Sequence, residues 1–213
     1  KNVITGGAPI IYTNDLGIRR KKNTLLAFLA HSSESQIHNI DDFQYLDYLA
    51  EEKSNFEDIY VSVFMLDKNE KIIDEILKRG LKVYLGAHPE DKLTLYRLRA
   101  LLEYHEYVSS NTMGGSIAYA LNFGCKVSLF HDLFKYDRSN MSLSGWSASD
   151  IARHEYVYSK EYLLKNYPDF FLPIKTSKAN LKLGRSFCGA SYKLSPRDVI
   201  DTVGWKLNNQ LVG

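Results

Sequence analysis

Small hydroxyl side chains and two glycines are concentrated between residues 109 and 116. Glycines let a ligand approach the backbone closely, and hydroxyls add hydrogen-bond donors without bulk. If a helix begins at the end of this segment, its first N–H groups are unpaired and its dipole favours a negative charge. The segment therefore predicts a phosphate site formed by Ser109, Ser110, Thr112, Gly114, Gly115 and Ser116. An ordinary turn with a Ser or Thr helix cap is the alternative.

This segment differs from two common phosphate-binding motifs. It does not have the GxGxxG spacing, and no Lys follows its glycines as in a Walker loop. Dinucleotide-dependent dehydrogenases and P-loop enzymes are therefore disfavoured.

Two further segments carry polar side chains suited to the same ligand. Pro89 fixes the backbone after His88, so the imidazole would be held in place and could donate a hydrogen bond to a phosphate. Ser32 and Glu34 offer a hydroxyl and a carboxylate after an earlier apolar run. A purely structural role is the alternative for His88. The other histidines show no ligand spacing with acidic residues, so we expect no metal held by side chains and no cofactor besides the substrate.

From Asn23 onward, short apolar runs alternate with amphipathic stretches, which is typical of βαβ units. Strands are expected at 25–30, 59–64, 83–85, 107–109 and 127–130, and helices at 41–49, 69–79, 91–104 and 115–123. The predicted fold is α/β, a doubly wound, mainly parallel, five- to six-stranded Rossmann-like sheet with a helical C-terminal tail. Carboxyl ends of parallel strands share one edge, so the three polar segments should face one crevice.

The pattern changes after residue 130, where helices are predicted at 149–165 and 195–205. We expect residues 1–22 to be a linker or the remnant of a partner domain, 23–135 a Rossmann-like ligand-binding domain, and 136–213 a helical extension packed on the same domain. The chain begins with Lys1 rather than Met, which favours a piece of a longer protein.

Composition narrows the class of protein. With 45% hydrophobic and 24% charged residues, the 213-residue chain is typical of a soluble globular domain. Its net charge of +2 argues against nucleic-acid binding. Two cysteines and no apolar run of transmembrane length favour a cytoplasmic location. The basic residues at 19–22 are either a solvated face or a contact with the inner face of a membrane.

The His88–Pro89 pair, the helix expected after it and the segment 107–127 together resemble the donor-binding half of a GT-B glycosyltransferase. The similarity is greatest to bacterial sialyltransferase-like enzymes of capsule and lipopolysaccharide assembly, and it covers residues 25–130. In those families the His of the His-Pro motif contacts the donor and a Ser/Thr motif holds its phosphate. The resemblance implies a nucleotide sugar, with CMP as the first candidate nucleotide, a bacterial surface glycan as acceptor, and His88 as a catalytic residue.

The sequence also departs from that family. The acidic motif that supplies the general base is missing, and Asp132 and Asp137 match only loosely the acidic pair of other GT-B enzymes. We therefore expect the base on an N-terminal partner domain. Two alternatives stay open: a non-catalytic glycosyltransferase-like module that binds a glycan or a partner protein, and a nucleotide-sugar epimerase. Four tyrosines of the tail could stack on a sugar or base, or pack against the domain: Tyr156, Tyr158, Tyr162 and Tyr167.

Overall fold

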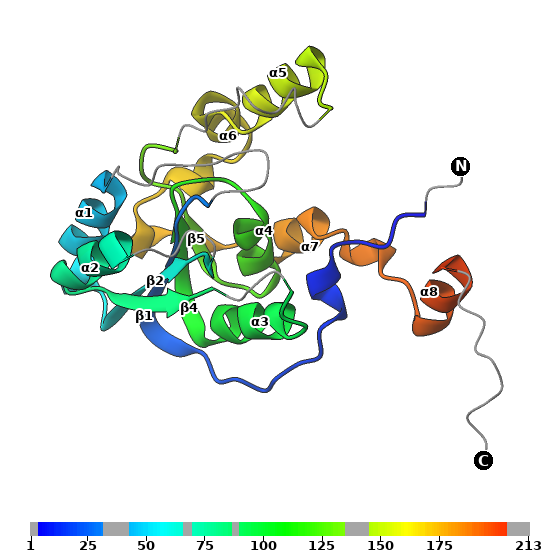
Figure 1. Cartoon of the computed structure of the whole chain (residues 1–213), viewed down its shortest axis with the longest axis horizontal. Helices are drawn as coiled ribbons and strands as arrows, with labels where there is room; N and C mark the ends of the chain where they lie inside the picture. Colours follow the sequence, from blue (N-terminus) through cyan, green and yellow to red (C-terminus); the bar gives the residue numbers. More distant parts are fainter. Residues whose placement is uncertain (1–3, 32–42, 66–69, 87–89, 135–144, 204–213) are drawn as a thin grey trace.

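The structure is a computed structural model that describes residues 4–31, 43–65, 70–86, 90–134 and 145–203. Its centre is a six-stranded sheet with the order β3-β2-β1-β4-β5-β6 (Figure 1). The first five strands pair in parallel and β6 pairs antiparallel with β5. The strands are β1 Lys21–Phe28, β2 Asp58–Val63, β3 Lys82–Leu85, β4 His105–Ser110, β5 Lys126–Ser128 and β6 Lys178–Ala179. This confirms the predicted doubly wound sheet, and the strand order reverses between β1 and β4.

Helices cover both faces of the sheet, and consecutive residues of β1 are buried on opposite sides. Leu25 packs toward α1 and α2, whereas Leu26 packs toward α3 and α4. A parallel strand covered on both faces needs such a continuous apolar run. The helices are α1 Gln44–Glu51, α2 Glu70–Lys78, α3 Thr94–Tyr104, α4 Gly115–Asn122, α5 Ala148–Val157, α6 Lys160–Asn166, α7 Leu181–Phe187 and α8 Pro196–Val203. Short 3-10 helices are η1 Pro9–Tyr12, η2 Glu52–Asn55, η5 Pro168–Phe171, η6 Ile174–Thr176 and η7 Ala190–Tyr192.

The C-terminal part differs from its prediction in two places. The helix expected at 149–165 is split into α5 and α6, because the Ser159 hydroxyl accepts a hydrogen bond from the Tyr162 amide and starts a new helix. β6 and α7 have no counterpart among the elements predicted from the sequence. In Figure 1, α5 and α6 form a lobe at the top of the body, and α8 lies to the right, away from the sheet.

Helix α7 packs directly against α4. Gly184 lies against the last turn of α4 so closely that an added Cβ would be 2.2 Å from the Asn122 nitrogen. Only glycine allows this approach of the two backbones. The close contact fixes α4, and with it the turn that precedes α4.

Arg20 joins the ends of two helices that lie on the same face of the sheet. Its guanidinium donates to the carbonyls of Phe123 and Gly124, both at 2.6 Å, and to those of Leu102 and Glu103 at 3.2 and 3.3 Å. These carbonyls follow or end α4 and α3, where unpaired C=O groups carry a partial negative charge. Arg20 therefore ties α3 and α4 to the start of β1.

Replacing Arg20 by Gln should lower the free energy of unfolding by about 2 kcal/mol, because several charge-assisted hydrogen bonds are lost. Urea denaturation would measure the change. The matched control is Arg19→Gln, since Arg19 is exposed and has no recorded partner in the described chain. Equal and small effects of both substitutions would contradict the role assigned to Arg20.

The expected linker at 1–22 contributes to the domain. β1 begins at Lys21, which forms ion pairs with Glu57 at 2.6 Å and Asp58 at 3.2 Å. Ile10 in η1 is fully buried. Two of the four basic residues at 19–22, Arg20 and Lys21, thus have partners within the domain. Within the described ranges, no helix combines the length and the apolar character needed to cross a membrane.

Candidate functional site

A cavity of about 350 Å³ lies at the carboxyl edge of the sheet and runs along α3. We call it the β3–α4 cavity. Leu85 and Gly86, at the end of β3, form one end, and the turn that leads into α4 forms the other. The full lining is Phe28, Leu29, His31, Ser62, Phe64, Leu85, Gly86, Thr94, Arg97, Leu98, Leu101, Thr112, Met113, Gly114, Gly115, Ser116 and Tyr119.

The dimensions of this cavity favour an extended ligand. β3 and β4 are separated by β2 and β1, so their ends are roughly 14 Å apart at the usual strand spacing. Between them the lining is mostly apolar and includes Phe28, Phe64 and Leu98. A free phosphate would fill only one end, whereas a flat ring joined to a phosphate would use both the apolar middle and the polar turn.

The polar end of the cavity is the N-terminus of α4. Gly114 precedes the helix in an extended conformation, with no side-chain cap. The amides of Gly115 and Ser116 are too early in the helix to have an intrahelical acceptor, and the described part of the chain provides no other. An added Cβ on Gly114 would have no atom within 4 Å, so the turn is open to a ligand. These unpaired amides and the helix dipole favour an anionic group.

Tyr119 adds a donor beside these amides. It lies one helical turn after Gly115, and an added Cβ on Gly115 would be 3.8 Å from the Tyr119 hydroxyl. Burial raises the pKa of Tyr119, so the phenol stays protonated. No partner for this hydroxyl is recorded in the described ranges. No sequence signal distinguishes Tyr119, because an aromatic residue within a short apolar helix is usually part of the core.

The predicted phosphate residues divide into two groups. Thr112, Gly114, Gly115 and Ser116 all line the cavity. Ser110 does not; it is buried, and its hydroxyl accepts a hydrogen bond from the Thr112 amide at 3.2 Å, which shapes the turn.

Ser109 points away from the cavity altogether. The Tyr45 hydroxyl, on the opposite face of the sheet, donates to the Ser109 hydroxyl at 2.9 Å. Successive side chains of a strand alternate between faces, so Ser109 and Ser110 cannot face the same ligand. The structure therefore does not bring Ser109 and Ser110 together on one side of the sheet, and neither lines the β3–α4 cavity.

Four other predicted site residues, His88, Pro89, Ser32 and Glu34, lie outside the described residues. Described residues that lie next to these two segments in the chain are close together in the structure. Gly86 and His31 line the same cavity, and the His31 ring is 4.9 Å from that of Phe64. Arg97 is a further cavity residue; its Nε atom is 2.9 Å from an Asp91 oxygen and its side chain is 65% exposed.

A second hollow of about 780 Å³ opens at the same edge, on the side of α1. Asn111 lines this hollow but not the β3–α4 cavity, and its side-chain oxygen accepts a hydrogen bond from the Ala30 amide at 2.8 Å, which joins the ends of β1 and β4. Asp132 lines this second hollow and is ion-paired with Lys160 at 2.7 Å. Asp132 is therefore not in the β3–α4 cavity, and Asp137 lies outside the described residues. In the described ranges, no three His, Cys, Asp or Glu side chains form a metal-binding group.

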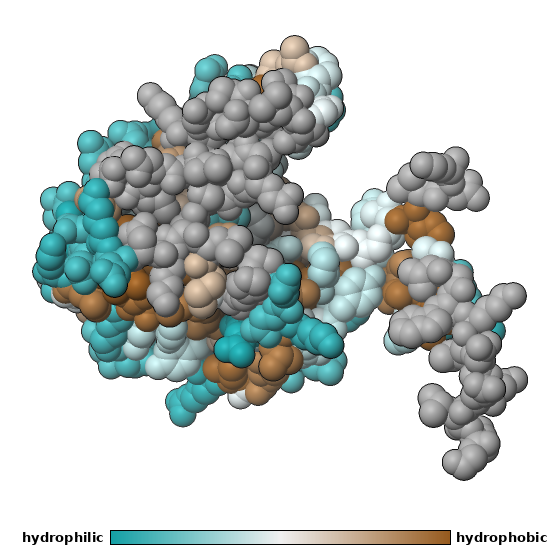
Figure 2. Space-filling model, in the orientation of Figure 1, coloured by the Kyte–Doolittle hydropathy of each residue, from teal (hydrophilic) through white to brown (hydrophobic). Residues whose placement is uncertain are grey.

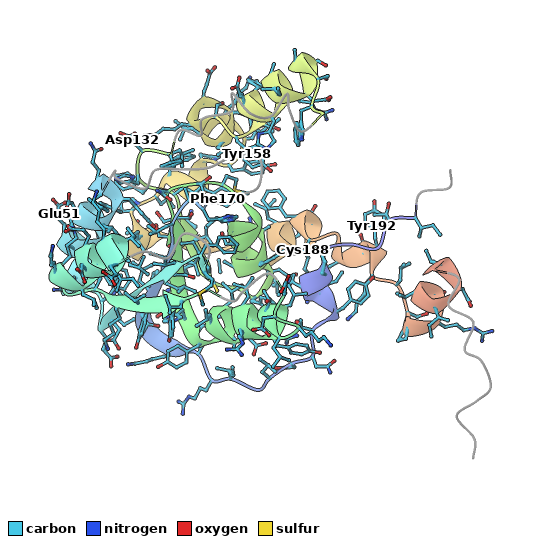
Figure 3. All side chains as sticks on the ribbon, viewed as in Figure 1. Glu51, Asp132, Tyr158, Phe170, Cys188 and Tyr192 are labelled. Atoms are coloured by element: carbon cyan, nitrogen blue, oxygen red, sulfur yellow. The ribbon has the colours of Figure 1, made fainter. Side chains whose placement is uncertain are left out.

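A third hollow of about 360 Å³ lies on the other side of the turn before α4. We call it the tyrosine cavity; it is lined by Met113, Gly114, Gly115, Ala118, Val157, Tyr158, Tyr162, Leu163, Tyr167 and Phe187. Tyr158 lies where α5 and α6 meet, on the side that faces the body (Figure 3). The turn Met113–Gly114–Gly115 thus forms a wall common to two cavities.

Comparison of the chain with protein-family models, curated proteins and solved structures found no match.

Proposed function

We propose that this chain is the donor-binding domain of a metal-independent glycosyltransferase that uses a nucleotide-activated sugar. The observation that carries the proposal is a single cavity with an apolar middle that ends at the uncapped N-terminus of α4. The nucleoside occupies the apolar part between the ends of β3 and β1, and the phosphate lies on the amides of Gly115 and Ser116. CMP is the first candidate for the nucleotide, on the resemblance of the His88–Pro89 segment alone.

Transfer of the sugar leaves negative charge on the nucleotide phosphate as the glycosidic bond to it breaks. The α4 amides and the Tyr119 hydroxyl are placed to stabilise this charge, because they are fixed before the reaction begins and point into a partly enclosed site. His88, which the resemblance places on the nucleotide phosphate, would add a further donor.

A second candidate is a non-catalytic module that binds a nucleotide or a glycan without transfer. It is favoured by one observation: none of the described residues that line the β3–α4 cavity is a carboxylate. Release of sugar from a radiolabelled nucleotide sugar, either to water or to an acceptor, would distinguish a transferase from such a module.

Titration calorimetry with CMP, CDP, UDP and GDP tests the proposed function. At least one nucleotide should bind in the micromolar range, and absence of binding by all four at millimolar concentration would refute the donor site.

Within the same titration, Tyr119→Phe should weaken the tightest-binding nucleotide about fivefold, the value of one hydrogen bond near 1 kcal/mol. Tyr192→Phe is the matched control, because Tyr192 is exposed and lines none of the described cavities. If Tyr119→Phe binds as wild type, the hydroxyl makes no contact with the phosphate.

A further inference from the structure

Three aromatic rings form a continuous row along α5 that the proposed donor site does not use. Trp146 precedes the helix, His154 lies in its last turn and Tyr158 follows its end. The Trp146 ring meets His154 edge-on, with centroids 5.4 Å apart, and the His154 ring stacks on Tyr158 at 4.4 Å. The row therefore leads from the outer end of α5 to the junction with α6.

These rings are not part of a hydrophobic core. No residue of α5 is buried, and the helix projects from the body (Figure 1). Trp146 and Tyr158 are 41% and 38% exposed. Packing against the domain, which is the alternative role for the tyrosines of the tail, therefore does not explain the positions of Trp146 and Tyr158.

The row lies along a second series of hollows. A shallow groove of about 500 Å³, which we call the α5 groove, is lined by Gly145, Trp146, Asp150, Arg153, His154 and Val157. It shares Val157 with the tyrosine cavity, which in turn shares Met113, Gly114 and Gly115 with the β3–α4 cavity. A ligand in this series would reach the turn before α4 from the side opposite the nucleotide.

We propose that the α5 groove and the tyrosine cavity bind an oligosaccharide. A pyranose ring presents a face of C–H groups, whose positive edges are attracted to the negative faces of aromatic rings. The hydroxyls at its rim need charged or polar partners, and Asp150 and Arg153 stand one turn apart in the groove. The described part of the chain provides no ion pair for Arg153, so its guanidinium is available to hydroxyl oxygens.

Identifying this saccharide as the acceptor of the transfer rests on the proposed function, whereas saccharide binding itself does not. The end of the saccharide nearest to Gly114 would then meet the sugar carried by the nucleotide phosphate. The chain would thus contribute to acceptor recognition as well as to donor binding.

The shape and charge of this surface favour a saccharide over a protein partner. Each hollow has the volume of a small-molecule site, and the charged residues Asp150 and Arg153 lie between the rings of Trp146 and His154 along α5. In Figure 2 the visible, described surface of the α5–α6 lobe is mainly pale or teal rather than one continuous hydrophobic patch. A stable protein interface would require a larger contiguous apolar area.

Saturation-transfer NMR on the whole chain with lactose, cellobiose and di-N-acetylchitobiose tests the inference. At least one disaccharide should show transfer to its ring protons, and Trp146→Ala and Tyr158→Ala should each weaken its binding at least about fivefold. Tyr158→Phe keeps the ring and should bind as wild type. Tyr192→Ala is the control, because Tyr192 is 58% exposed and lies on the arm at the right, apart from the α5–α6 lobe (Figure 3).

Nucleotide affinity, measured on the same proteins, separates the two proposals. Wild type that binds a nucleotide but none of the three disaccharides would overturn the saccharide site and leave the donor site standing. Wild type that binds a disaccharide but no nucleotide would support the saccharide site and overturn the proposed transferase. If both folded alanine variants bind the saccharide as wild type does, the inference is overturned and the saccharide binds at another site. If the substitutions change only the oligomeric state, the inference is overturned and this surface is a protein interface.

Discussion

Replacing Gly114 by Leu should reduce nucleotide affinity about a hundredfold and leave the stability of the fold unchanged. Gly114 has an extended backbone with φ of −168°, which any residue adopts, and an added Cβ would meet no atom within 4 Å. The same open space is where the phosphate lies in the proposed complex. A branched side chain there would exclude the ligand from the α4 amides, and a hundredfold loss corresponds to about 2.7 kcal/mol.

A second, smaller substitution at Gly114 makes this test more specific. Gly114→Ala adds one methyl group and should cost less affinity than Gly114→Leu, while thermal melting should give nearly the same midpoint for both. Calorimetry with the tightest-binding nucleotide measures the affinity. Full binding by the folded Leu variant would mean that the nucleotide does not reach the turn, and the donor site would have to be placed elsewhere.

The architecture could be predicted from the sequence because each buried strand has its own apolar signal. β2 is apolar enough to be found, β4 is marked by Tyr107 and Val108, and the helix that follows β2 repeats apolar residues at helical spacing. β6 has no such signal, since its two residues, Lys178 and Ala179, are exposed and lie at the edge of the sheet, where they pair only with β5. Polar residues Lys21–Asn23 likewise conceal the true start of β1.

The candidate site could be predicted only in part, because the sequence locates a turn but not the direction of each side chain. The hydroxyl-rich segment does lead into a helix whose first amides are unpaired, as expected. Which hydroxyl side chains face the cavity depends on the strand pleat and on partners distant in the chain, such as Tyr45 for Ser109. Arg97 and Tyr119 reach the cavity only because α3 and α4 lie side by side on one face.

Stability of the folded chain should depend strongly on the charge state of His105 at the amino end of β4. Its ring is fully buried between Tyr60, Tyr84 and Tyr104, and neither ring nitrogen has a hydrogen-bond partner. Burial lowers the pKa of His105 to about 4; Asp58 opposes this shift and Lys21 adds to it. The folded state therefore holds His105 neutral well below the ordinary histidine pKa of about 6.5.

The sign of the effect follows from the proton balance. Between about pH 6.5 and pH 4 the unfolded chain binds a proton at His105 that the folded chain does not, so stability falls as the pH falls through this window. A depression from 6.5 to about 4 corresponds to about 3 kcal/mol when the pH is below both values, and about 2.5 kcal/mol at pH near 4.5.

His105→Phe should remove this dependence, since a phenyl ring has a similar shape and leaves no hydrogen bond unpaired. Urea denaturation at about pH 8 and about pH 4.5 gives the free energy of unfolding of both proteins. Carboxylates also lose stabilising charge in acid, but both proteins contain the same carboxylates. The change with pH in the difference between their free energies of unfolding therefore reports on His105 alone. If the difference in free energy of unfolding between the two proteins stays constant with pH, His105 is protonated in the folded chain at about pH 4.5. Water would then reach the ring between Tyr60, Tyr84 and Tyr104.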